Sequence, residues 1–196
     1  MTYYSTNGQA PLASLEDVVI NSLASDKGLY MPEYIPVIAK EVIAGMKYLS
    51  FQEIADIVAQ AFFGEDMDSQ ALTDIVYDTL SYETPVVHVH DNIYTLELFH
   101  GPTLAFKDTG ARFMARLSSY FIRRKGLDKE VNVLVATSGD TGGAVANGFL
   151  RTQGIHVFVL YPKGKVSQIQ ECQFTTLGNN ITALEIDGTL TTARHW

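Results

Sequence analysis

The chain of 196 residues contains a single cysteine, Cys172, and this excludes an intramolecular disulfide. A lone thiol fits a reducing compartment, and we expect Cys172 to be a small buried apolar residue without a chemical role. No apolar stretch is long enough to cross a bilayer, and residues 1–5 lack the basic and apolar parts of a secretory leader. These absences predict a cytoplasmic protein with no membrane partner.

Basic residues are scarce as well. The chain has 14 Lys and Arg against 22 Asp and Glu, which gives a formal net charge of −8. Non-specific nucleic-acid binding needs a basic face, so we predict no nucleic-acid partner. What the chain does have is apolar content: 46% of its residues are hydrophobic and 11% are aromatic, enough to bury a substantial core in one or two domains.

The first eighty residues are predicted to be mainly helical. Ser14 followed by Asp17 and Ser50 followed by Glu53 are capping-box patterns, each preceding an apolar periodicity of the helical kind. A third helix is predicted over residues 69–80. This segment shows no catalytic cluster, so we expect it to act as a scaffold or lid.

Two strands are predicted next, over residues 84–89 and 93–99, around the turn pair 91–92. His88 and His90 stand two residues apart in the first strand, so they should point to one face and could bind a metal ion. No third ligand type lies nearby in the sequence. We therefore predict a polar strand face and no metal site.

From residue 107 onward, helical and extended patterns alternate. A helix is predicted to run from there to about residue 126, with Asp108 at its positive end and the basic residues 123–125 at its negative end. Further strands and helices are predicted in alternation over residues 131–136, 144–150, 155–161, 166–177 and 181–186. Successive crossover units of this kind predict a parallel sheet with helices on both faces.

Lys107 closes the run Leu-Phe-His-Gly-Pro-Thr-Leu-Ala-Phe-Lys, which spans residues 98–107. A lysine among apolar neighbours is a candidate for amine chemistry, because desolvation disfavours the ammonium form and frees the lone pair that a Schiff base requires. The alternative is a solvated charge at the start of a helix. Phe99 and Phe106 are expected in the core, although an aromatic ring beside Lys107 could shield it from water.

A glycine-rich loop follows the predicted strand at 131–136 and reads Thr137-Ser138-Gly139-Asp140-Thr141-Gly142-Gly143. Open α/β sheets bind ligands at the carboxyl ends of their strands, and free backbone amides in such a loop could hold a carboxylate or a phosphate. An ordinary strand-to-helix turn is the alternative. The Gly-Lys-Ser/Thr ending of a nucleotide-binding P-loop is missing. Lys163 and Lys165 could attract a phosphorylated substrate or lie in a solvated turn.

Three separated segments carry a family resemblance: residues 26–32, which read Asp-Lys-Gly-Leu-Tyr-Met-Pro, residues 100–108, and residues 136–143. In this order and spacing they resemble the threonine synthases, pyridoxal-phosphate enzymes of the tryptophan-synthase-β fold type. Related dehydratases carry Ser-x-Lys-x-Arg where this chain reads Ala-Phe-Lys-Asp-Thr over residues 105–109. The resemblance extends to about residue 188.

The fold that this resemblance implies is of the α/β class. A helical N-terminal segment, residues 1–83, would precede an incomplete three-layer parallel-sheet fold that binds pyridoxal phosphate (fold type II), residues 84–188. Residues 189–196 would form an atypical tail.

The resemblance also implies a pyridoxal-phosphate-dependent carbon–oxygen lyase acting on phosphate, which converts O-phosphohomoserine and water into threonine and phosphate in threonine biosynthesis. Lys107 would be the Schiff-base and catalytic residue, with Phe106 and Asp140 beside the cofactor. The substrate would be bound by Thr137, Ser138, Gly139, Thr141 and Gly142. Many relatives in the wider fold type have asparagine in place of Asp140, so we expect Asp140 to point away from the cofactor's phenolate, to be protonated, or to pair with a cation.

In this fold type, the phosphate cup and the contact to the pyridine nitrogen come from a later part of a longer chain. We therefore expect a truncated product that binds the cofactor weakly, is inactive, and self-associates through an uncovered last strand. Two other functions stay open. One is a non-catalytic fragment or anion-binding module of the same fold, and the other is a pyridoxal-phosphate-dependent dehydratase that catalyses β-elimination.

Overall fold

The structure is a computed structural model that describes residues 1–193, so the last part of the expected tail, residues 194–196, lies outside the described residues. The chain forms two compact units, Met1–Ser81 and Tyr82–Trp196. The assignment of the first segment to a helical subdomain and of the second to cofactor binding stays a prediction.

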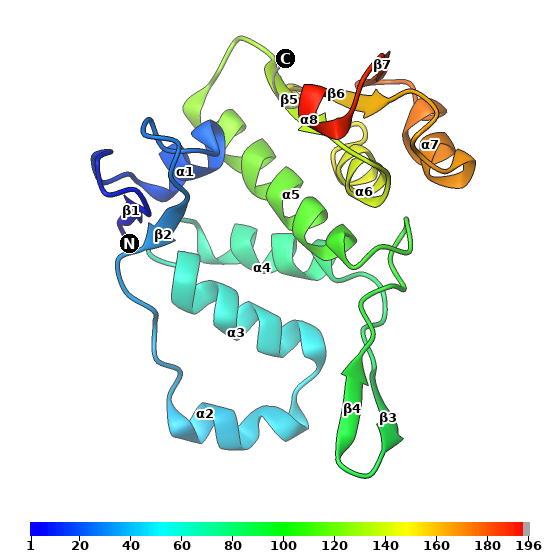
Figure 1. The fold of residues 1–196 in the computed structure, drawn as a ribbon. Coiled ribbons are helices and arrows are strands. Elements are labelled where there is room, and N and C mark those ends of the chain that lie inside the picture. Colours follow the sequence, from blue (N-terminus) through cyan, green and yellow to red (C-terminus); the bar gives the residue numbers. More distant parts are fainter. Residues whose placement is uncertain (194–196) are drawn as a thin grey trace. The chain divides into compact units, whose positions relative to one another are not determined.

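The first unit is mostly helical (Figure 1). Its elements are β1 (Tyr3–Ser5), α1 (Leu15–Asn21), β2 (Tyr30–Pro32), α2 (Lys40–Gly45), the 3-10 helix η1 (Met46–Tyr48), α3 (Phe51–Phe63) and α4 (Ser69–Thr79). The predicted helix starts are confirmed: the Ser14 side chain caps α1, and Ser50 and Glu53 form a complete capping box on α3. The third predicted helix is confirmed as α4, one residue shorter than expected.

Sequence reasoning missed the two-stranded antiparallel pairing of β1 with β2. The carboxylate of Asp26, just before β2, stabilises this pairing by accepting hydrogen bonds from Ser5 Oγ at 2.6 Å and from the backbone amides of Gln9, Ala10 and Gly28 at 2.9 Å each. These bonds, Ser5 first, lower the pKa of Asp26 from 3.8 to about 2. In this structure, Asp26 in the 26–32 motif therefore has a clear structural role.

The second unit begins with the hairpin of β3 (Val86–His90) and β4 (Ile93–Leu96), which confirms the predicted strand pair. The expectation that His88 and His90 share one face is wrong, because a bulge lies between them. His88 pairs with Tyr94 and His90 pairs with Ile93, and consecutive residues of a strand point to opposite faces. His88 also bonds to the backbone carbonyl oxygen of Asp91, with 2.8 Å between Nε2 and the oxygen.

The rest of this unit is α5 (Lys107–Lys125) followed by β5 (Val131–Ala136), α6 (Asp140–Gly148), β6 (Ile155–Pro162), α7 (Gln168–Thr175), β7 (Ile181–Ile186) and the short α8 (Leu190–Ala193). The strands pair in parallel in the order β5-β6-β7. This confirms the predicted alternation, and the bounds of β5 and β7 are those expected. The helix α6 begins four residues earlier than predicted.

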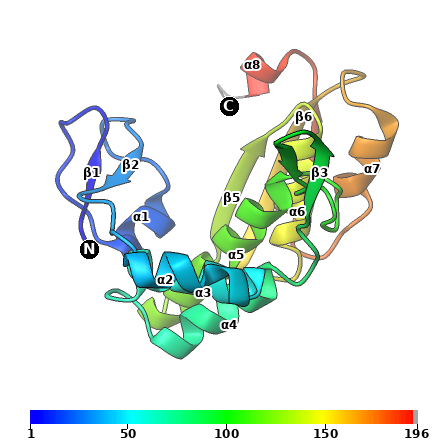
Figure 2. The same cartoon turned by 90° about the horizontal axis from the view of Figure 1, so that it is seen from below.

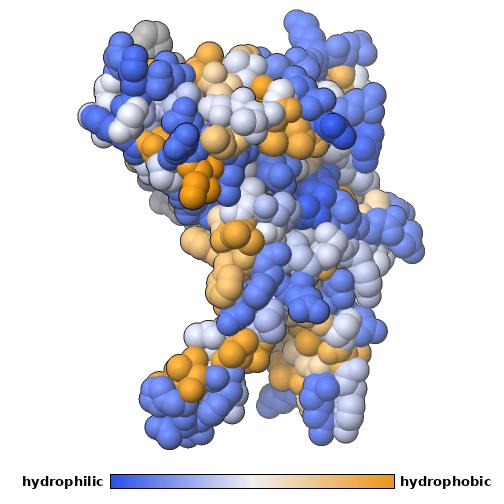
Figure 3. Space-filling model, turned by 90° about the vertical axis from the view of Figure 1, so that its right-hand side faces the viewer, coloured by the Kyte–Doolittle hydropathy of each residue, from blue (hydrophilic) through white to orange (hydrophobic). Residues whose placement is uncertain are grey.

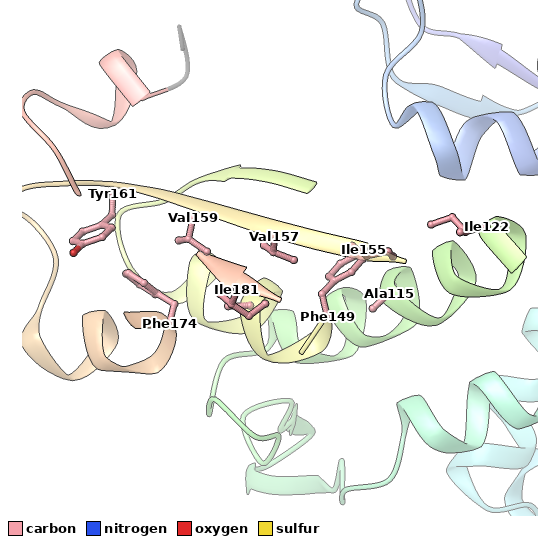
Figure 4. Close-up of a cluster of buried hydrophobic side chains, with 10 residues drawn as sticks. Ala115, Ile122, Phe149, Ile155, Val157, Val159, Tyr161, Phe174 and Ile181 are labelled. Atoms are coloured by element: carbon pink, nitrogen blue, oxygen red, sulfur yellow. The ribbon is translucent and has the colours of Figure 1, made fainter. Parts of the chain in front are cut away.

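One face of the sheet carries the core (Figure 4). Alternate residues of β6 point into it, and they meet side chains from the helices α5, α6 and α7. The buried members of this core are Ala115, Ile122, Ala146, Phe149, Ile155, Val157, Val159, Tyr161, Phe174 and Ile181. The helix α6 packs between α5 and α7, and Figure 2 shows α5 and α6 alongside β5 and β6.

Within the described residues, the helices α5, α6 and α7 pack on one face of the sheet, and the helical layer expected on the other face is incomplete. The strand order never reverses, so two right-handed crossovers in the same direction place α6 and α7 on the same side. On the opposite face, Leu134 is 70% exposed and Leu184 is 44% exposed, and the short α8 contacts β6. The described residues therefore supply the sheet and one helical layer of the three-layer fold.

Apolar side chains also reach the surface elsewhere, as Figure 3 shows for one face of the molecule. Every residue of β3 and β4 is exposed. Cys172 on α7 is exposed and free, so the expectation of a buried thiol is wrong. It lies on the side of α7 away from Phe174, which is the buried residue of that helix.

Candidate active site

Lys107 is the first residue of α5, a helix of 19 residues. A cation there faces the positive end of the helix dipole, which is an unfavourable position unless an anion lies close. The segment before the helix is held by Asp108, which is only 1% exposed. Its carboxylate accepts bonds from the backbone amide of Thr103 at 2.9 Å and from Thr103 Oγ1 at 2.5 Å. Gly101 is needed for this fold of the loop, because a Cβ there would lie 2.6 Å from Asp108 Oδ2.

The glycine loop is shorter than expected, because α6 begins at Asp140 and includes Gly142 and Gly143 in its first turn. Thr137 is buried, and its Oγ1 accepts bonds from the amides of Gly139 at 3.0 Å and Gly142 at 2.9 Å. The expectation of free amides at these two glycines is therefore wrong, and so is the one for Gly143, whose amide bonds to the carbonyl oxygen of Gly139 at 3.3 Å. Ser138, by contrast, is exposed at the edge of the sheet.

The two motifs meet in one ion pair. Lys107 Nζ donates to Asp140 Oδ2 at 2.6 Å, across 33 residues of sequence. The side chains remain accessible, at 34% and 45% exposed. The bond from Lys107, followed by the bond that the Thr141 amide donates at 2.8 Å, holds the pKa of Asp140 below its ordinary value. Of the three possibilities for Asp140, the structure shows pairing with a cation.

The apolar enclosure expected around Lys107 is not present in the described residues. Phe106 is 61% exposed and Phe99 is 51% exposed, so the prediction that these two rings lie in the core is wrong. Neighbours in sequence at a helix start point in different directions, so an apolar run there does not become an apolar pocket. The ring of Phe106 nevertheless lies 4.9 Å from Lys107 Nζ, within the range of a cation–π contact.

Sequence reasoning missed two glutamines of α7, Gln170 and Gln173, which both lie against the glycine loop. A Cβ at Gly139 would collide with Gln170 Oε1, and a Cβ at Gly143 would lie 2.5 Å from Gln173 Oε1. Gln173 Nε2 also donates to the carbonyl oxygen of Thr103 at 3.1 Å. Their i, i+3 spacing places both on one helix face, which is the signal that the sequence offered.

The two lysines after β6 that sequence analysis considered are both exposed. Lys163 is exposed in the turn after β6, and Lys165 Nζ donates to the carbonyl oxygen of Gly188 at 3.0 Å. Residues 1–193 contain no group of three His, Cys, Asp or Glu placed to hold a metal ion. Over the same residues, no helix has the length and apolarity needed to span a bilayer.

The second unit is an α/β fold with a parallel sheet. At the start of one of its helices, a lysine pairs with the glycine loop that follows the first strand of the sheet. These features define an α/β protein with a candidate ligand site at the carboxyl edge of its sheet. Comparisons with known proteins specify the class further. Residues 2–80 match the family model described as threonine synthase N terminus. The chain is 39% identical to threonine synthase of Pseudomonas aeruginosa over 194 residues and 38% identical to that of Escherichia coli over 188 residues, in each case covering 96% of this chain.

Solved structures agree. A pyridoxal-phosphate-bound threonine synthase from Brucella melitensis matches all of this chain with a TM-score of 0.91 and 35% identity, and threonine synthase from Escherichia coli does so with 0.88 and 37%. In sequence and fold, the chain is similar to the N-terminal portion of these threonine synthases. It spans less than half the length of these relatives, between 41% and 45% of each.

Proposed function

We propose that this chain forms part of a pyridoxal-phosphate-dependent threonine synthase, a carbon–oxygen lyase acting on phosphate, in which Lys107 anchors the cofactor covalently through its amine. The observation that carries the proposal is the contact of Lys107 Nζ with Asp140, because it joins two of the three segments of the resemblance at one place. The amine, once released from Asp140, fits the cofactor's aldehyde chemically, since its side chain is 34% exposed and has an aromatic ring beside it.

The reaction proposed is the conversion of O-phosphohomoserine and water into threonine and phosphate. Pyridoxal phosphate, when bound, supplies an electron sink for the bonds at the substrate's α-carbon. Lys107, with its Nζ free and deprotonated, would be the base in this chain that moves the substrate's α and β protons. Asp140 holds that Nζ by a direct hydrogen bond while no cofactor is attached to it.

The substrate's carboxylate is proposed to bind at the start of α6, where the helix dipole favours an anion. The amides of Gly139 and Gly142 are already bonded to Thr137, so that residue and these glycines shape the loop. Contact with the carboxylate then falls to Ser138, which is exposed, and to Thr141. Phe106 would shield one side of the amine from water.

Covalent trapping tests this proposal. The chain is incubated with pyridoxal phosphate, reduced with borohydride and analysed by peptide mass spectrometry, with Lys107→Met as the test variant and Lys129→Met, at an exposed position, as the matched control. We expect the reduced cofactor on the peptide containing Lys107, with loss of that label in Lys107→Met only. Labelling at another lysine would overturn the assignment.

Phosphate release from O-phosphohomoserine, compared with deamination of serine, separates the proposed function from a dehydratase. Threonine formed together with phosphate supports the synthase. Keto-acid formation from serine supports the dehydratase. Labelling at Lys107 without turnover is expected of this chain alone, so turnover is measured with the full-length protein, where its absence with both amino acids favours the non-catalytic anion-binding module.

A further inference from the structure

Four contacts connect the segment that leads into α5, residues 103–108, with the glycine loop and the first turn of α6, residues 137–143. Lys107 pairs with Asp140 on α6, and the next residue along α5, Asp108, holds Thr103 through two hydrogen bonds. The carbonyl oxygen of Thr103 accepts from Gln173 Nε2 at 3.1 Å, and Gln173 Oε1 lies against Gly143 in the first turn of α6. Gln173 is therefore the side chain of α7 that touches both motifs at once.

We propose that Gln173 is a positioning residue, which holds the Lys107 segment and the glycine loop at the separation that lets Lys107 Nζ reach Asp140. Gln173 touches neither the amine nor the carboxylate, so it acts through Thr103 on one side and Gly143 on the other. Glutamine suits this role because its side-chain amide donates through Nε2 to Thr103 while Oε1 of the same amide packs against Gly143. The amides of Gly139 and Gly142 are not available for this bond, since the hydroxyl of Thr137 already accepts both.

The geometry at Gly143 supports this role. A Cβ at this position would approach Gln173 Oε1 to 2.5 Å and Gln173 Cβ to 3.3 Å, so the absence of a side chain is what allows Gln173 to lie across the helix start. An added methyl group would displace the flexible end of Gln173 and break its bond to Thr103. Changes at Gly143 and at Gln173 should therefore act on the same contact.

The test measures how well Lys107 is held, without any cofactor. Acetic anhydride reacts with free amines, and the amine of Lys107 is protected while it is bonded to Asp140. The acetylation rate of Lys107, relative to the exposed Lys129 of the same molecule, is measured by mass spectrometry in Gln173→Met. This variant keeps the length of the side chain and removes the donor. The matched control is Gln168→Met, at an exposed position of the same helix.

We expect Gln173→Met to raise the relative acetylation rate of Lys107 by about two- to tenfold, the change in open population that loss of one hydrogen bond gives. Gln168→Met should leave the rate unchanged. Gly143→Ala should give a similar increase, and the double variant should add little to either single change. This pair also keeps the proposal testable if Gln173→Met does not fold, because Gly143→Ala leaves α7 intact.

A fall in thermal stability of Gln173→Met with no change at Lys107 would overturn the proposal and leave Gln173 a packing residue. Additive effects in the double variant would also overturn it. The consequence for cofactor binding rests on the proposed function, and it predicts faster borohydride-trappable attachment of pyridoxal phosphate to Lys107 in Gln173→Met, because the amine released from Asp140 is the form that attacks an aldehyde as well as an anhydride. The two ideas fail separately, since acetylation reports positioning even where Lys107 never binds the cofactor.

Discussion

Asp108, almost fully buried, accepts hydrogen bonds from both the backbone amide and the hydroxyl of Thr103, five residues earlier. These hydrogen bonds hold together the loop that precedes α5, the helix that begins at Lys107. It places a structural carboxylate directly beside the candidate catalytic amine. The two neighbouring residues thus have separate tasks, since Asp108 points into the protein and Lys107 points toward the glycine loop.

Replacing Asp108 with alanine should destabilise the second unit by about 1–3 kcal/mol, because the buried donors of Thr103 would lose their acceptor. Asp128→Ala, at an exposed position, is the control and should change stability by less than about 0.5 kcal/mol. Chemical denaturation monitored by circular dichroism measures the difference. Equal stability of the two variants would contradict the structural role of Asp108.

The pKa of Asp140 should rise toward its ordinary value in Lys107→Met. In the folded protein the bond from Lys107 lowers this pKa, so the ion pair adds stability above the ordinary carboxyl range and loses it as the pH falls through the lowered value. Carboxyl-carbon NMR titration of Asp140 follows the change directly. Lys129→Met should leave the titration where it is, and a matching shift in that control would show that general charge, not the Lys107 contact, sets the pKa.

Acid should destabilise the pairing of β1 with β2 in a defined pH range. Asp26 has a pKa lowered from 3.8 to about 2, so the stability that its hydrogen bonds give to β1 and β2 is present above about pH 4 and disappears as the pH falls through about 2. Amide hydrogen exchange at Gly28, Gln9 and Ala10 should accelerate over this window. In Ser5→Ala the onset should move to higher pH, because the strongest contribution to the lowered pKa is removed. An unchanged onset would mean that Ser5 does not control this titration.

Self-association should occur through the uncovered face of the sheet. Leu134 on β5 and Leu184 on β7, the two strands that flank β6, are both exposed there. Within the described residues, β5 and β7 each have one strand neighbour, which leaves two edges for pairing with another chain. Sedimentation velocity should show concentration-dependent oligomers, and Leu134→Lys should shift the distribution toward monomer. A monodisperse monomer of the unmodified chain would refute this expectation.

Local pattern was enough to predict most of the elements. The caps at Ser14 and Ser50, the alternation from residue 107 onward and the bounds of β5 and β7 follow from hydrogen bonds and periodicities that span only a few residues. The expectation for the His88–His90 strand failed because a bulge depends on pairing with β4, which a single strand's alternation does not encode.

For the candidate site, residue patterns were enough to predict the chemical groups present: a lysine at a helix start, a glycine loop after a strand, and motifs that resemble those of the threonine synthases. Which of these groups touch depends on the tertiary packing. The strand order places α6 and α7 on one face of the sheet. Packing then brings Asp140 to Lys107 and Gln173 to Thr103. The hydroxyl of Thr137 accepts a hydrogen bond from a loop amide that was expected to be free for a ligand. Such contacts cross tens of residues, so they depend on how whole elements pack, which no local pattern in one sequence records.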